Sequence, residues 1–116
     1  MPFNTYLLDN AINNQKQVNE QCRLTTLKKL LNWLDTFGGN YDISCAYIFG
    51  SITQPYHFTS HSDVDIAVEK IQPENLFLTI SLISTTLERD VDIIDINKCH
   101  FADKIRQEGI LWMRKT

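Results

Sequence analysis

The sequence has no long hydrophobic run. None of its apolar stretches approaches the roughly 18 residues that a helix needs to cross a bilayer. The opening segment, MPFNTYLLDNAINNQ, also lacks the basic stretch followed by an apolar stretch that marks a secretory signal peptide. Both absences favour a protein that stays in the cytoplasm and has no membrane partner.

Cysteine is scarce and poorly placed for pairing. The three cysteines, Cys22, Cys45 and Cys99, are an odd number, lie far apart and form no CxxC motif. This spacing disfavours both a disulfide framework and a zinc site. Cys45 lies inside an apolar run, so we expect it in the core.

The sequence also lacks a basic stripe. Its formal net charge is −3 and its pI is near 5.5, which disfavours direct binding to nucleic acid. A chain of 116 residues that is 43% apolar has the size and the composition of one packed domain. We therefore expect a single domain over residues 1–116, in which residues 1–17 form a polar lead-in, with a helix as one interpretation of this segment.

Hydrophobic periodicity predicts three helices. Apolar residues at helical spacing indicate a first helix from about Asn19 to Phe37, which Gly38-Gly39-Asn40 ends. A second helix is predicted from Pro73 to about Arg89 and a third over residues 98–108. The residues expected to face the core are Leu24, Leu27, Leu30, Leu31, Leu34 and Phe37, then Leu76, Phe77, Ile80, Ile83 and Leu87, then Phe101 and Ile105, with Gly109 as the last C-cap.

Short runs of strand-forming residues separate these helices. We expect strands over residues 43–49, 63–68 and 91–96, a short one over 110–113, and a polar loop from Thr53 to Ser62. Helices that alternate with strands predict an α/β or α+β fold, with helices packed on a small sheet.

Two carboxylates stand two positions apart at the start of the second predicted strand. Side chains at this spacing point to one face, so Asp63 and Asp65 lie side by side while Val64 faces a core. Like charges this close repel each other unless a cation lies between them. A hard divalent ion such as magnesium suits these oxygen ligands.

The third predicted strand carries another aspartate in a similar position. Asp92 is flanked by core-facing Val91 and Ile93, so its carboxylate points to the opposite face of the sheet. If the two strands are neighbours, Asp92 completes a cluster with Asp63 and Asp65. A cluster of this kind bridges two metal ions in phosphoryl chemistry.

A Gly-Ser pair closes the first predicted strand. Gly50 would let a phosphate approach the backbone closely, and the Ser51 hydroxyl with the following N–H groups could hold phosphate oxygens. A lone Gly-Ser is usually a turn. Its order before Ser62-Asp63-Val64-Asp65 and a later aspartate strand is much rarer.

These motifs resemble the minimal nucleotidyltransferases of the polymerase-beta-like superfamily. The likeness rests on Phe49-Gly50-Ser51, on Ser62 to Val68 and on Val91 to Asp95, and it extends from about residue 20 to the C-terminus. It implies a nucleotidyltransferase fold with a small mixed β-sheet. It also implies that Gly50, Ser51 and Ser62 bind the nucleotide.

The resemblance further implies a reaction and a partner. Asp63, Asp65 and Asp92 would be the catalytic residues and would bind magnesium, with manganese as an alternative ion. The substrate would be ATP, attacked at its α-phosphorus with release of pyrophosphate. Many members of the family are antitoxins that silence a HEPN-type ribonuclease toxin by transferring AMP to one of its tyrosines. The expected activity is therefore that of a protein adenylyltransferase.

One departure from the family pattern leaves two alternative functions open. The loop after Gly-Ser reads Ile52-Thr53-Gln54-Pro55-Tyr56, without the basic residues and second glycine that are frequent in the family. This favours an alternative in which the protein neutralises the toxin by binding alone. A second alternative is a small-molecule, aminoglycoside-like nucleotidyltransferase, which the short chain disfavours because it leaves no acceptor pocket.

Overall fold

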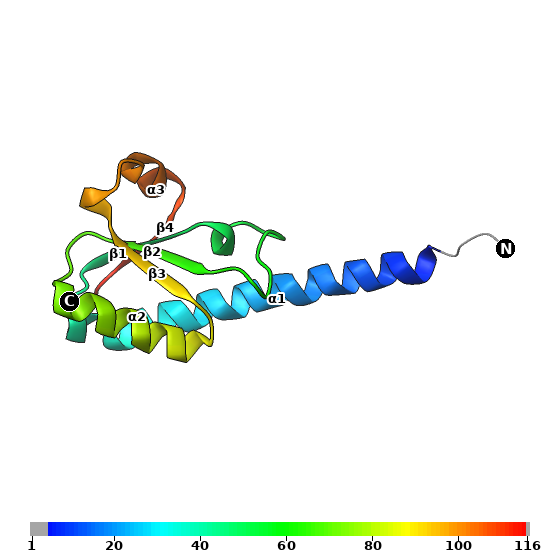
Figure 1. The fold of residues 1–116 in the computed structure, drawn as a ribbon, viewed down its shortest axis with the longest axis horizontal. Helices are drawn as coiled ribbons and strands as arrows, with labels where there is room; N and C mark the ends of the chain where they lie inside the picture. Colours follow the sequence, from blue (N-terminus) through cyan, green and yellow to red (C-terminus); the bar gives the residue numbers. More distant parts are fainter. Residues whose placement is uncertain (1–4, 116) are drawn as a thin grey trace.

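A four-stranded sheet forms the centre of the protein (Figure 1). The structure, a computed structural model, describes residues 5–115. Its elements are α1 (Tyr6–Phe37), β1 (Cys45–Phe49), β2 (Val64–Val68), α2 (Pro73–Leu87), β3 (Val91–Asp95), α3 (Ala102–Glu108) and β4 (Ile110–Met113), with 3-10 turns at Gly38–Tyr41, Ser51–Thr53 and Ile96–Lys98.

The strand order is β3-β2-β1-β4. β1 pairs antiparallel with both β2 and β4, whereas β2 and β3 run parallel. The parallel pair is connected through α2, as a parallel connection requires a crossover. The sheet is therefore mixed, and the expected α/β fold is confirmed.

Helices cover the two faces of the sheet unequally. α1 and α2 pack on one face, where Leu30, Leu34, Ile66 and Ile83 belong to the main core (Figure 1). On the other face the short α3 covers only part of the sheet through Ile105, which packs with Ala67 and Ile96. The remainder of this second face is open to a ligand.

The first helix begins earlier than predicted. α1 starts at Tyr6 instead of about Asn19, so most of the expected lead-in belongs to it. Its N-terminal part projects beyond the sheet (Figure 1), and the molecule measures 64 × 28 × 23 Å. None of the helices within residues 5–115 has the length and apolar character needed to span a membrane.

Several residues expected in the core are exposed. Leu24 and Phe37 on α1, Phe77 on α2 and Phe101 before α3 all belong to the exposed large apolar residues, and Cys45 is only partly buried. For Leu24, Phe37 and Phe77 the reason is geometric: the sheet covers each helix only along a narrow stripe, and these side chains fall outside it. Thr79 takes a place in the core of α2 that apolar periodicity did not indicate.

Gly109 has a different role from the predicted one. Its φ of −74° and ψ of 162° are extended instead of left-handed, so it is not an αL cap. A Cβ at this position would lie 2.6 Å from the carbonyl oxygen of Ile105 and 3.1 Å from that of Ile48. A glycine is required here because two backbones approach closely.

Candidate active site

The parallel pairing of β2 with β3 brings two of the predicted carboxylates together. Asp65 and Asp92 occupy paired positions in the register, and Phe49 of β1 stands on the other side of Asp65. Strand parity places their side chains on the face that α3 partly covers, where Ala67 and Ile94 also point. Asp63 directly precedes β2 and is exposed.

The electrostatics of Asp65 reflect this crowding. Partial burial raises the pKa of the Asp65 carboxyl above its usual value, and the nearby charges of Asp92 and Asp63 raise this pKa further. Both neighbours therefore lie close enough to destabilise the ionised form of Asp65. A cation held among the three groups would relieve this repulsion.

The donor set suits a hard divalent ion, because it consists of carboxylate oxygens alone. In residues 5–115, however, no three His, Cys, Asp or Glu side chains converge closely enough to hold a metal ion. The structure brings Asp65 and Asp92 onto paired positions and leaves Asp63 at the edge of the group. The carboxylate oxygens are suitable ligands for the predicted ion, but these side chains would have to move closer together to bind it.

Gly50 lies directly against this carboxylate group. Its φ of 84° and ψ of −158° fall in a region that only glycine adopts readily. A Cβ at this position would stand 2.6 Å from Oδ2 of Asp65. The predicted need for glycine after the first strand thus has a second cause, which is contact with the Asp65 carboxylate.

Ser51 opens a single 3-10 turn, Ser51–Thr53. The turn is closed by the Thr53 N–H and the Thr53 hydroxyl, which donate to the Gly50 carbonyl oxygen at 3.0 and 2.8 Å. Ser51 is partly exposed, and its hydroxyl makes no hydrogen bond to another residue of the described chain. It is therefore available to a ligand beside Gly50.

Two charged residues of α1 hold the loop that follows. Nη1 of Arg23 donates to the Ile52 carbonyl oxygen at 3.0 Å, and the Tyr56 N–H donates to Oε2 of Glu20 at 2.7 Å. Glu20 and Arg23 also form a salt bridge with each other. This pair was not among the predicted site residues, although opposite charges at i and i+3 are a visible signal in the sequence.

The end of the same loop is fixed by Arg89, just after α2. Its Nη1 donates to the carbonyl oxygens of Ser62 at 2.7 Å and Thr59 at 3.1 Å, and its guanidinium lies 4.2 Å from the centre of the Phe58 ring. The Ser62 hydroxyl accepts a hydrogen bond from the Thr59 N–H at 2.9 Å. The structure thus places the predicted nucleotide-binding Ser62 in a loop turn next to Asp63.

We expect Arg89→Lys to lower the free energy of unfolding by about 1–3 kcal/mol. Lysine keeps the charge but has no planar guanidinium that can lie on the Phe58 ring while one of its nitrogens donates to both carbonyl oxygens. Urea denaturation measures the change. Arg106→Lys is the matched control, because Arg106 forms only an exposed ion pair of 3.7 Å with Glu69, and it should change stability by less than about 0.5 kcal/mol. Equal effects of both substitutions would contradict the anchoring role of Arg89.

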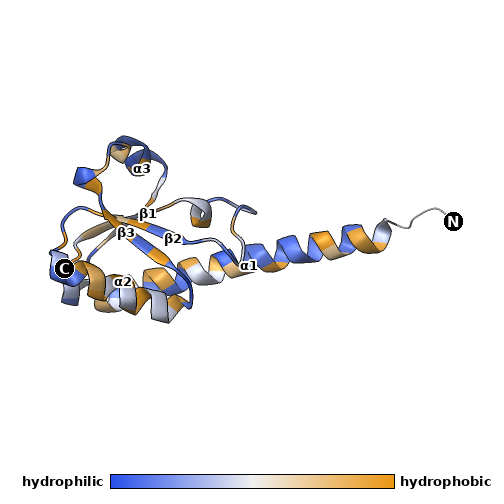
Figure 2. Cartoon of the chain, in the orientation of Figure 1, coloured by the Kyte–Doolittle hydropathy of each residue, from blue (hydrophilic) through white to orange (hydrophobic). Residues whose placement is uncertain are grey.

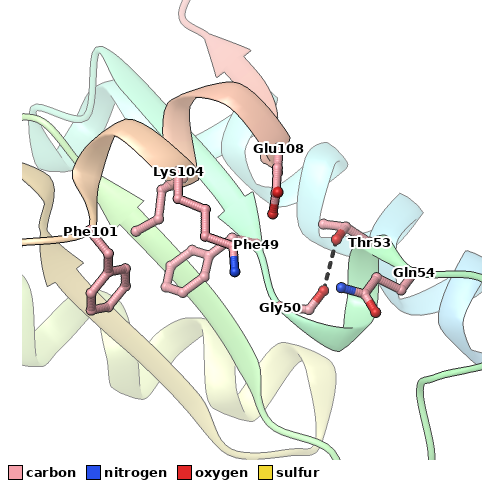
Figure 3. Close-up of a pocket in the computed structure, with 8 residues that line it drawn as sticks. Phe49, Gly50, Thr53, Gln54, Phe101, Lys104 and Glu108 are labelled. Atoms are coloured by element: carbon pink, nitrogen blue, oxygen red, sulfur yellow. Dashed lines mark hydrogen bonds between the residues drawn. The ribbon is translucent and has the colours of Figure 1, made fainter.

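A pocket of about 520 Å³ adjoins Gly50 (Figure 3). It is lined by Phe49, Gly50, Thr53, Gln54, Phe101, Lys104, Ile105 and Glu108. Lys104 and Glu108 extend from α3 toward the Gly50–Gln54 turn, and the rings of Phe49 and Phe101 pack edge to face with centres 6.5 Å apart. The sequence alone did not indicate this lining, because its residues come from two stretches far apart in the chain, 49–54 and 101–108.

The sequence matches one protein family over residues 28–116, and that family is described as polymerase beta, nucleotidyltransferase. The chain belongs to this family. It is therefore a nucleotidyltransferase, as the Gly-Ser and Asp-x-Asp motifs indicated. No curated protein matches the chain in sequence.

Solved structures with the same fold come from toxin–antitoxin complexes. One, a toxin–antitoxin with AMP-PNP, has a TM-score of 0.58 and 21% identity, and covers 76% of this chain and 73% of its own. An MntA–HpeT variant with a tyrosine-to-alanine substitution has a TM-score of 0.56 and 22% identity, covering 73% and 72%. At these identities the likeness establishes the fold.

A third similar structure is that of a variant in which two aspartates are substituted. It is an MntA–HpeT variant with two aspartate-to-glutamate substitutions two positions apart, at a TM-score of 0.57 and 18% identity, covering 73% of this chain and 74% of its own. The first 27 residues of the present chain lie outside the family match, which begins at residue 28.

Proposed function

We propose that this nucleotidyltransferase is the antitoxin of a toxin–antitoxin pair and acts in the cytoplasm. It would transfer AMP from ATP to a tyrosine of a HEPN-type ribonuclease toxin. The single observation that carries the proposal is the placement of Asp65 and Asp92 on paired positions beside Gly50 and an open pocket, in a chain of this family. The likeness in fold to toxin–antitoxin proteins, one with AMP-PNP, supports the partner class and the nucleotide.

The chain's own residues divide the work of binding. Gly50 leaves room for a phosphate at the end of β1, and the Ser51 hydroxyl would donate to phosphate oxygens. Asp63, Asp65 and Asp92 would hold magnesium or manganese. The bound ion would supply charge stabilisation for the phosphates and lower the pKa of the attacking hydroxyl. Positioning and electrostatics would account for most of the rate.

The transfer needs no reactant other than ATP and the tyrosine hydroxyl. The tyrosine oxygen forms a bond to the α-phosphorus of ATP, the bond from that phosphorus to the bridging oxygen breaks, and pyrophosphate leaves. The hydroxyl proton is released, and we assign its acceptance to the Asp92 carboxylate, which lies on this face of the sheet beside Asp65. The added AMP places bulk and negative charge where the ribonuclease would hold an RNA phosphate, and repulsion then blocks the substrate.

The acceptor must bring its own surface. The family match accounts for residues 28–116, and the pocket of about 520 Å³ has the size of one small ligand. The nucleotide would occupy this pocket, so we expect a protein acceptor with a surface of its own in preference to an aminoglycoside-like one. The net charge of −3 favours a basic protein partner such as a ribonuclease.

The test is to mix the purified pair with ATP and magnesium and weigh the toxin by mass spectrometry. We expect the toxin to gain the mass of one or more AMP units with the wild-type protein. We expect no gain with the double variant Asp63→Asn, Asp65→Asn. A toxin that is fully neutralised with no mass gain would overturn the enzymatic proposal. It would establish instead a non-catalytic antitoxin, which the lack of basic residues and of a second glycine in the loop after Gly50-Ser51 favours.

Lys104 gives a sharper test of the pocket. We expect Lys104→Ala to raise KM for ATP by about tenfold and to leave kcat less affected, because the loss of one ammonium group facing the pocket weakens ground-state binding of an anion. Steady-state kinetics with the toxin as acceptor measure both constants. Lys98→Ala is the matched control, since Lys98 lies in the turn before α3 and does not line this pocket. An unchanged KM in Lys104→Ala would place the nucleotide elsewhere.

A further inference from the structure

The projecting part of α1 presents an apolar face that the domain does not cover. Leu7, Leu8, Ile12 and Val18 are 69%, 49%, 46% and 62% exposed, and with Ala11 they fall within one side of the helix at 100° per residue. Figure 2 shows hydrophobic segments alternating with hydrophilic ones along the projecting part of α1. Burial of such a face usually accounts for most of the stability of a helix, so an exposed one is an interaction surface.

Charged residues mark one flank of this face. Asp9 and Lys16 are both exposed and lie seven residues apart, which is two helical turns, so they stand on the same side beside Ile12. The opposite flank, near Leu7 and Asn14, carries no charge. The charges of Asp9 and Lys16 are therefore complementary to those of a second copy of the helix that runs antiparallel to the first.

We propose that two copies of this chain associate through the α1 arm, which we define as Tyr6–Val18, packed antiparallel. A two-fold axis that crosses the arm between residues 12 and 13 sets Asp9 of each copy opposite Lys16 of the other, and sets Ile12 against its own equivalent. A parallel pair would instead place the charged flank against the uncharged one. Complementary flanking charges select helix orientation in this way.

Two further features suit this arrangement. Gln15, the polar residue within the apolar face, donates through Nε2 to Oδ1 of Asn19 at 3.0 Å, so part of its hydrogen bonding is already satisfied. A groove of about 480 Å³ opens beside Val18 where the arm meets the domain, and Cys22, Thr25 and Leu87 also line it. In the antiparallel pair the N-terminal end of the second arm arrives at this groove.

The expected association is moderate in strength. An arm of 13 residues is about 20 Å long and buries less than the roughly 800 Å² per partner of a standard interface. We therefore expect dissociation in the micromolar range and stronger association at low ionic strength. The arm contains none of the residues proposed to bind the nucleotide or the metal ion.

Sedimentation velocity on the full chain up to about 100 µM, without nucleotide, tests the proposal. We expect Asp9→Lys and Lys16→Asp each to weaken dimerisation at least about tenfold, because each puts like charges at both contacts. An equimolar mixture of these two variants restores opposite charges at both contacts, and should dimerise like the wild type. A mixture that stays monomeric would overturn the antiparallel geometry.

Apolar contact is tested separately. Ile12→Asp should abolish dimerisation because it brings two charges together at the two-fold axis. Asn13→Asp, the same charge on the opposite side of the helix, should leave it intact. A wild-type chain that is monomeric at about 100 µM would overturn the proposal and leave the arm to a different partner such as the toxin. A dimer insensitive to Ile12→Asp would also overturn it. Neither result depends on the AMP-transfer reaction.

Discussion

Replacement of Asp65 by asparagine is expected to abolish AMP transfer and, in the absence of metal, to raise the melting temperature. The carboxyl is partly buried beside Asp92 and Asp63, and these causes raise its pKa. Its ionised form is therefore less favourable in the folded protein than in the unfolded chain, and asparagine of the same shape removes that cost. Loss of the charge should lower transfer at least about a hundredfold if it holds the metal ion.

The sign of the pH dependence follows from the same shift. A carboxyl whose pKa is raised on folding makes the folded state less stable as the pH rises through its titration, since the folded state then binds more protons than the unfolded one. Without metal, the melting temperatures of wild type and Asp65→Asn should converge at acid pH and separate toward neutral pH. Differential scanning calorimetry at several pH values measures this.

The effect of magnesium on the melting temperature is a second test. It should raise the melting temperature of wild type and not that of Asp65→Asn. Asp90→Asn is the matched control, because Asp90 is exposed in the turn before β3 and should behave as wild type in transfer and in metal response. Retained transfer activity in Asp65→Asn would contradict the assignment of this carboxylate.

The second large effect is expected at Gly50. Gly50→Ala should lower the free energy of unfolding by at least about 1–3 kcal/mol, because alanine is strained at this φ and ψ. Its Cβ would also stand 2.6 Å from Oδ2 of Asp65 and would displace this carboxylate. Transfer activity should therefore fall even in the fraction that remains folded. Urea denaturation and the mass-spectrometric assay measure the two effects.

Gly39→Ala is the control for this substitution. A Cβ at Gly39 would meet Cδ of Arg114 at 3.2 Å, and this flexible side chain can move aside. We expect a change in stability of less than about 0.5 kcal/mol and unchanged transfer. If Gly50→Ala were as mild as Gly39→Ala, the close contact of Gly50 with the carboxylate group would be contradicted.

Local patterns in the sequence were sufficient for the elements and for the side on which each aspartate lies. The alternation of Val64, Asp65 and Ile66 predicts an aspartate opposite the core, and the structure has Val64 and Ile66 buried in the main core. The three helices and four strands were found, with shifted ends. The start of α1 was predicted too late because its first turns are rich in asparagine, a weak helix former, although a helical lead-in was one interpretation of this segment.

Other features depended on the path of the chain through space. The sequence predicted that Asp92 joins Asp65 only if their strands are neighbours, and the parallel pairing of β2 with β3 meets this requirement. The support of the Gly50 loop by Arg23 and Arg89, and the pocket beneath α3, join segments far apart in the chain. By itself the sequence determined the family, the elements and the candidate carboxylates, because periodicity and motif spacing are local properties. The tertiary structure alone decided which strands are neighbours and which distant side chains meet, because those contacts depend on how the elements pack.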